Sequence, residues 1–179
     1  MKYFFCVMFC LVTVSAMAQQ KPSPYAGQET RDIKALSDED IRAYQNGLGM
    51  ALAKAGELNH YPGPLHVLEL AGPLKLSDAQ KRRTEEIRQV MLNETIPVGT
   101  RIIEKERELD QLFASGSIDN AKLDSTLADI GRLQGELRAA HLRAHLEQKK
   151  ILTPEQVANY DELRGYTSAE AGIEHHMQH

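Results

Sequence analysis

Two long stretches of the sequence repeat apolar residues at the spacing of an α-helix: residues 78–114, and a second stretch that a cap at Ser117 or Asp119 opens and that ends near Lys150. The apolar residues are Ile87, Met91, Val98, Ile102, Leu109 and Phe113 in the first stretch, and Leu123, Leu127, Ile130, Leu133, Leu137, Ala140, Ala144 and Ile151 along and just beyond the second. Only the short polar loop Ser115-Gly116-Ser117 separates the two stretches. Two long helices joined by such a loop must run antiparallel, so the sequence predicts a helical hairpin.

The same five-residue motif, Leu-Ser/Thr-x-x-Gln, occurs twice, at residues 76–80 and 152–156. In a capping box the hydroxyl accepts from a backbone N–H of the first turn, and the glutamine side chain reaches back to the N-cap N–H. The motifs therefore predict helices that begin at residue 78 and at residue 154, the second ending near Arg164. The motif residues are Leu76, Ser77 and Gln80, and Leu152, Thr153 and Gln156.

Shorter helices are expected before the hairpin. The segment Ser37-Asp38-Glu39-Asp40 resembles a capping box, and the apolar spacing after it predicts one helix that ends near Leu58, weakened by Gly47, Gly49 and Gly56. A turn cluster at 59–64 is followed by a short helical piece at 65–71. No stretch shows sustained two-residue alternation, so the predicted fold is all-α, with shorter N- and C-terminal helices beside the hairpin.

The first 18 residues have the pattern of a signal peptide. Lys2 is followed by an almost uncharged apolar stretch, and Ala16-Met17-Ala18 is a cleavage signature. We expect cleavage after Ala18 and export to the periplasm, because a membrane anchor needs about 20 apolar residues. The rest divides into a flexible leader at 19–28, a single helical domain at 29–166 and a disordered, polar, His-rich tail at 167–179.

Composition excludes several kinds of function. Both cysteines, Cys6 and Cys10, lie in the signal peptide, so thiol catalysis, disulfides and Cys-based metal sites are excluded from the mature chain. The formal net charge is −4 and the sequence has no basic block, so its charge does not favour nucleic-acid binding. There is no Gly-x-Ser-x-Gly elbow and no Gly-rich phosphate loop, so we expect no catalytic residues and no enzymatic activity.

Histidines are the candidate metal ligands. His141 and His145 are four residues apart, which places them on one helix face and allows two imidazoles to hold one Zn²⁺, Ni²⁺ or Cu²⁺. The alternative, which we favour, is that both are partly exposed, hydrogen-bonded residues beside the hairpin seam. The terminal segment 175–179 is rich in His and Met and suits loose metal scavenging. His60 and His66 flank a proline turn and are interpreted as structural.

Taken together, these features resemble a known family. The signal peptide, the cysteine-free mature chain, the hairpin and the two motifs are similar to the Spy/CpxP group of bacterial periplasmic LTxxQ-motif proteins, which are related to periplasmic heavy-metal sensor and resistance proteins. The similarity covers roughly residues 68–166. It implies an all-helical homodimer that acts as an ATP-independent chaperone or an envelope-stress modulator. Its metal-sensing relatives bind divalent ions through His, Glu and Met, and His141 and His145 are the positions most like such ligands.

Three functions follow from this sequence. A thin hairpin cannot bury every side of its helices, so some apolar surface must face a partner or a client. The leading hypothesis is a periplasmic chaperone that holds unfolded or misfolded envelope proteins on this surface, without ATP or any required cofactor and without stable insertion into the membrane. The second is a heavy-metal sensing or resistance protein that binds Zn²⁺, Cu²⁺ or Ni²⁺. The third is a regulatory partner of a membrane sensor protein.

Overall fold

The structure, a computed structural model, describes residues 23–166. The predicted signal peptide and the predicted tail lie outside these residues. Residues 23–30 form turns, and a compact unit that starts at Arg31 contains every helix found in the described part of the chain. Because residues 23–166 form helices and no β-strand, the predicted all-α fold is confirmed. None of these helices is long and apolar enough to cross a membrane.

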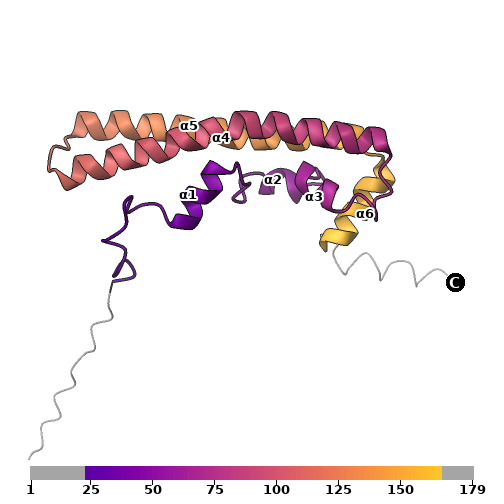
Figure 1. Cartoon of the computed structure of the whole chain (residues 1–179), viewed down its shortest axis with the longest axis horizontal. Helices are drawn as coiled ribbons and strands as arrows, with labels where there is room; N and C mark the ends of the chain where they lie inside the picture. The colour runs from indigo at the N-terminus through magenta and orange to yellow at the C-terminus, as the bar shows by residue number, and fades with distance from the viewer. Residues whose placement is uncertain (1–22, 167–179) are drawn as a thin grey trace, which may run out of the picture. The chain divides into compact units, whose positions relative to one another are not determined.

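The hairpin consists of α4 (Asp78–Ala114) and α5 (Asn120–Ile151), which lie side by side along their length (Figure 1). The predicted hairpin is therefore confirmed. α4 continues through Pro97 as a single helix. The carboxylate of Asp119 caps α5 by accepting a hydrogen bond from the backbone N–H of Lys122 at 2.9 Å.

The hairpin seam contains most of the predicted apolar residues. Those that are buried are Ile87, Met91 and Ile102 on α4, and Ile130, Leu133, Leu137, Ala140 and Ala144 on α5. Phe113 and Leu127, however, are about half exposed, at 57% and 48%. They belong to the apolar surface that a thin hairpin is expected to leave uncovered, because two helices alone do not enclose side chains at the flanks of their contact.

The single helix predicted from residue 38 to about Leu58 is also wrong. The structure has two helices there, α1 (Asp38–Gln45) and α2 (Lys54–Glu57). The chain leaves the helical conformation at Gly47, with φ +60°, and the following Met50 and Ala51 have φ values of +43° and +60°. Glycine adopts this left-handed conformation freely and commonly ends a helix. Ser37 and Asp40 nevertheless form the expected capping box of α1.

The short helices follow one another along one side of the hairpin (Figure 1). α1 comes so close to α4 that a Cβ atom on Gly99 would lie 2.4 Å from the carbonyl oxygen of Tyr44. α3 (Pro64–Glu69) contacts both α4 and α5, and it lies near α6 (Pro154–Arg164) at the open end of the hairpin. There one buried cluster joins these elements: Val67, Leu74, Leu76, Leu152 and Tyr160.

The two Leu-Ser/Thr-x-x-Gln motifs cap α4 and α6 as predicted, and they also contact each other. Ser77 and Thr153 each accept from the backbone N–H of their motif glutamine at 3.2 Å. The Nε2 of Gln80 donates to Oε1 of Gln156 at 2.8 Å, and the Nε2 of Gln156 faces Oε1 of Gln80 at 3.2 Å. The amide of Gln80 also donates to the carbonyl of Ile151, at 2.8 Å. The motifs thus fasten α4, the end of α5 and α6 together.

Candidate functional site

His141 and His145 lie one turn apart on α5, and both are buried, with 3% and 9% of their surfaces exposed. The prediction that they are partly exposed was wrong. The segment from α2 to α3 covers this part of α5, because added Cβ atoms on Gly56 and Gly63 would both contact His145. Burial and the neighbouring His145 together lower the pKa of His141.

His145 is held in one tautomer by the covering segment. Its Nδ1 lies 2.7 Å from the carbonyl oxygen of Tyr61. A carbonyl oxygen can only accept, so Nδ1 carries a proton, and in the neutral imidazole Nε2 is the nitrogen with the lone pair. A Cβ atom on Gly63 would lie 2.9 Å from Cε1 and 3.0 Å from Nε2 of this ring, so glycine leaves the room that the imidazole occupies.

Glu57 of α2 lies beside this imidazole. Its Oε2 is 3.5 Å from Nδ1 of His145. Its other oxygen, Oε1, accepts hydrogen bonds from the hydroxyls of Tyr160 and Tyr166, the latter at 3.1 Å, and lies 3.7 Å from Nε of Arg164. The carboxylate therefore connects α2, α5 and the end of α6.

A cavity of about 480 Å³ opens next to Glu57 and His145. We call it the histidine pocket. The polar, charged and sulfur-containing side chains that line it are Met50, Lys54, Glu57, His66, His145, Arg164 and Tyr166. His66 resembles His145 in one respect: its Nδ1 lies 2.8 Å from a carboxylate oxygen of Glu69, so that Nε2 is its remaining nitrogen. The pocket thus brings together two imidazoles whose Nδ1 atoms are already engaged.

The lining of the histidine pocket contains residue types that divalent transition metals use as ligands. Metal-binding histidines commonly tie one ring nitrogen to a carbonyl or carboxylate and bind the ion with the other, and the Nδ1 atoms of His66 and His145 are tied in this way. Imidazole and carboxylate ligands suit Zn²⁺, Ni²⁺ and Cu²⁺, and the thioether of Met50 adds a soft donor. Within residues 23–166, however, no three His, Cys, Asp or Glu side chains are gathered closely enough to enclose an ion.

His141 does not line the histidine pocket, although it shares a helix face with His145. Its Nε2 is buried and has no hydrogen-bond partner within residues 23–166. A buried polar atom without a partner is uncommon in folded proteins and calls for an explanation. The predicted pair is therefore close together on α5, but the cavity contains only its second member.

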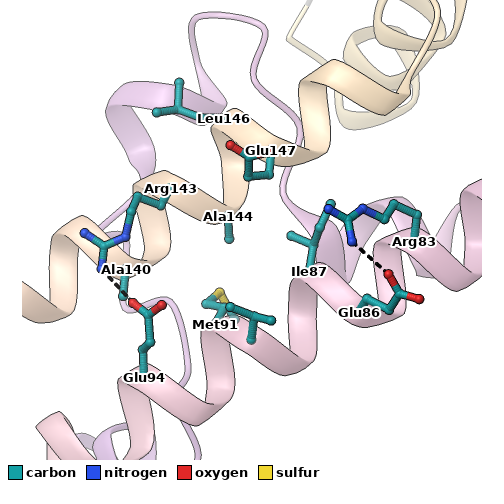
Figure 2. Close-up of a pocket in the computed structure, with 11 residues that line it drawn as sticks. Arg83, Glu86, Ile87, Met91, Glu94, Ala140, Arg143, Ala144, Leu146 and Glu147 are labelled. Carbon is teal, nitrogen blue, oxygen red and sulfur yellow. Dashed lines mark hydrogen bonds and ion pairs between the residues drawn. The ribbon is translucent and has the colours of Figure 1, made fainter.

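A second cavity, of about 230 Å³, lies between α4 and α5 (Figure 2). We call it the apolar groove; its apolar lining is Ile87, Val90, Met91, Ala140, Ala144 and Leu146. Val90 and Leu146 are 58% and 49% exposed. Two ion pairs lie at its edge, Arg143 with Glu94 at 2.6 Å and Arg83 with Glu86 at 2.8 Å. All of its lining residues belong to the hairpin, so no short helix covers it.

The sequence profile of the heavy-metal resistance family matches residues 47–159, which is more than half of the chain. The chain belongs to this family. The match spans both Leu-Ser/Thr-x-x-Gln motifs, and it confirms the relationship to metal-resistance proteins that the motifs indicate. It also includes Glu57, His66, His141 and His145. No solved structure gives a significant match to the chain.

Several residues of the histidine pocket were not predicted from the sequence. Glu57 and the two tyrosines, Tyr160 and Tyr166, were not singled out, and His66 was interpreted as structural. A signal was present in the turn cluster at 59–64, which has Glu57 and His66 on either side. Because a turn brings its two flanks close together, this pattern could have indicated a site that contains Glu57 and His66.

Proposed function

We propose that this protein binds a divalent heavy-metal ion in the histidine pocket, with Nε2 of His145 and Nε2 of His66 as its first ligands. The observation that carries this proposal is that His145 and His66, from different helices, line one cavity with Nδ1 already engaged. In each ring only Nε2 remains to bind a metal. The membership in the heavy-metal resistance family supports the same function.

Binding requires some movement or additional water ligands, because three donors are not yet gathered among the described residues. Glu57 and Met50 line the cavity and are the candidates to complete the set. Lys54 and Arg164 also line it, and their positive charges oppose a cation, so we expect moderate rather than extreme affinity. The protein would act by binding and buffering metal in the periplasm after export, and not as an enzyme.

Calorimetric titration of the full exported chain with Zn²⁺, Ni²⁺ and Cu²⁺ tests the proposal. We expect a dissociation constant below about 0.1 mM for at least one ion, and a loss of at least tenfold in His145→Ala and in His66→Ala. The matched control replaces His175, His176 and His179 by Ala, which removes the histidines of the terminal segment. Binding that disappears only in this control would overturn the proposal, as would binding of an oxyanion such as arsenate without any of the three cations.

A second candidate function is chaperone-type binding of unfolded envelope proteins, and the apolar groove favours it. Exposed apolar side chains beside paired charges suit weak, reversible contacts with a client. The same surface suits a second copy of the chain in a homodimer, or a membrane sensor protein. No ATP or cofactor is needed for such contacts.

Light scattering of a denatured client at an equimolar ratio tests this candidate. The exported chain is expected to delay aggregation, and Val90→Asp is expected to remove the delay by placing a charge in the groove. Phe113→Asp is the matched control, because Phe113 is equally exposed but does not line the groove. Equal loss in both variants, or no delay by the native chain, would argue against client binding in the groove. Sedimentation of the same proteins reports whether Val90→Asp instead breaks a dimer.

A further inference from the structure

We propose that the histidine pocket takes its metal as an anionic complex with a small polycarboxylate, and not as the hydrated ion. The two imidazoles replace water ligands of the complex, while Lys54 and Arg164 contact the carboxylates of the chelating molecule. This inference rests on the proposed function of the pocket and names the chemical form in which the metal is bound.

The charges that line the pocket favour an anion. Lys54 and Arg164 are both in the lining, and Glu57 is the only carboxylate there among the described residues. This carboxylate is already engaged, because its Oε1 accepts from two tyrosine hydroxyls and lies 3.7 Å from Nε of Arg164. The charged or titratable groups found within 4 Å of it in the described chain are Arg164 and His145, and not Lys54. Counting these two cations and one carboxylate, the lining has a net positive charge, which opposes a bare dication.

The cavity is also larger than a single ion requires. Its volume is about 480 Å³, whereas about 10–15 Å³ in a comparable measure holds one water molecule. Sites for small organic molecules are typically about 300–1,000 Å³. Met50, Ala51, Ala53 and Leu58 form an apolar part of the wall, which suits the carbon skeleton of such a molecule. The cavity therefore has room for an ion together with an organic ligand.

The chain itself supplies too few donors to enclose an ion. His145 and His66 each offer Nε2, because the carbonyl of Tyr61 and the carboxylate of Glu69 lie 2.7 and 2.8 Å from their Nδ1 atoms. Among residues 23–166, no three His, Cys, Asp or Glu side chains are gathered for one ion. A Zn²⁺ site typically has about four ligands. A chelating molecule that enters with the metal supplies the donors that the pocket lacks.

A polycarboxylate complex of a dication matches these charges. In citrate the carboxylates outnumber the charges of Ni²⁺, so the one-to-one complex is net negative, and its outer oxygens can accept from an ammonium or a guanidinium group. Lys54 is exposed on α2 and Arg164 lies at the end of α6, so the two cations come from different helices. The groups that oppose the hydrated ion thus stabilise the complex.

Calorimetry and native mass spectrometry of the full exported chain test this inference with three probes. They are hydrated Ni²⁺, its one-to-one complex with citrate, and its one-to-one complex with diethylenetriamine, an uncharged chelator that leaves the complex cationic. We expect the citrate complex to bind at least about tenfold more tightly than the other two, because its carboxylates gain charge-assisted hydrogen bonds. The mass of the bound protein is expected to include both Ni²⁺ and citrate.

Lys54→Met separates the two forms of the metal by the direction of its effect. Loss of this charge is expected to weaken binding of the citrate complex by about fivefold or more, and to leave binding of hydrated Ni²⁺ equal or tighter. Lys54 is exposed, so the variant is expected to fold. Lys150→Met is the matched control, because Lys150 is an exposed lysine of α5 that does not line the pocket. It is expected to change either affinity by less than about twofold.

The outcomes distinguish this inference from the proposed function. Hydrated Ni²⁺ that binds through His145 as tightly as the citrate complex overturns the inference and leaves the proposed function standing. Equal weakening of both forms in Lys54→Met has the same consequence, and so does citrate that binds equally well without Ni²⁺ while hydrated Ni²⁺ still binds through His145. If no form of the metal binds, or if binding does not depend on His145, both are overturned.

Discussion

The side-chain amides of Gln80 and Gln156 pair with each other across the open end of the hairpin, at 2.8 and 3.2 Å. Each amide also completes the capping box of its own helix, through the backbone N–H of Ser77 or Thr153 at 3.0 Å. The glutamine of each motif thus caps its own helix and also links α4 to α6. This pairing holds α6 in the place from which its tyrosines reach Glu57.

Gln80→Ala is expected to lower the free energy of unfolding by about 1–3 kcal/mol, because it removes a cap and leaves buried partners without hydrogen bonds. Gln89→Ala is the control, since the Gln89 side chain bonds only to exposed Asn93 on the same helix. That change is expected to stay within about 0.5 kcal/mol. Urea unfolding measures both, and equal losses would contradict the role of the paired glutamines.

Gly99→Ala is expected to destabilise the protein, although alanine favours a helix by about 1 kcal/mol over glycine. The added Cβ atom would lie 2.4 Å from the carbonyl oxygen of Tyr44, so α1 would have to move away from α4. Gly131→Ala is the matched change on α5, where a Cβ atom meets nothing within 4 Å. It is expected to stabilise by about 0.5–1 kcal/mol. Thermal unfolding compares the two, and a gain in both would show that α1 does not pack as described.

His141 is expected to make the metal-free protein sensitive to acid. Its pKa is lowered in the folded state by burial and by His145, so below about pH 6.5 the unfolded chain binds the proton more readily than the folded one. The contribution of His141 to the free energy of unfolding is therefore complete above this pH. It decreases as the pH falls, by at most about 1.4 kcal/mol per pH unit. Urea unfolding between pH 8 and pH 5.5, in the presence of a chelator, measures the slope. His141→Leu should flatten it, and an unchanged slope would assign the sensitivity to another group.

Gly63→Ala is expected to weaken metal binding by tenfold or more and also to lower the free energy of unfolding. Its φ of −84° suits alanine, but the added Cβ atom would lie 2.9–3.0 Å from the ring of His145 and displace it. Gly72→Ala is the control, because a Cβ atom there meets nothing within 4 Å. Zn²⁺ calorimetry with both variants checks the expectation. Unchanged affinity in Gly63→Ala would mean that the position of the His145 ring does not matter for binding.

The hairpin, its ends and the helix at 154–164 could be predicted because they depend on patterns among residues that are close together in the sequence. Helical periodicity, the loop at 115–117 and the two capping motifs are all read from neighbouring residues. The prediction failed between residues 45 and 54, where apolar spacing continued but Gly47 turns the chain against α4. A long-range contact of this kind leaves no local pattern.

The histidine pocket was harder to predict for the same reason. Glu57 and Tyr160 are far apart in the sequence and become neighbours only when α2 and α6 both pack at the open end of the hairpin. The spacing of His141 and His145 placed both on one face of a helix, and the structure has them one turn apart on α5. It did not show that one of the two lines a cavity while the other is enclosed, because the covering segment at 56–63 is not part of that helix.

The most direct test of the account is the imidazole ¹⁵N spectrum of the full exported chain during a Zn²⁺ titration. The proposed function predicts that the Nε2 resonance of His145 moves to the position of a metal-bound nitrogen, while its Nδ1 remains protonated through the carbonyl of Tyr61. Resonances of the histidines at 175, 176 and 179 are expected to respond later, at higher metal concentration. An unchanged His145 spectrum after Zn²⁺ has bound would contradict the central claim.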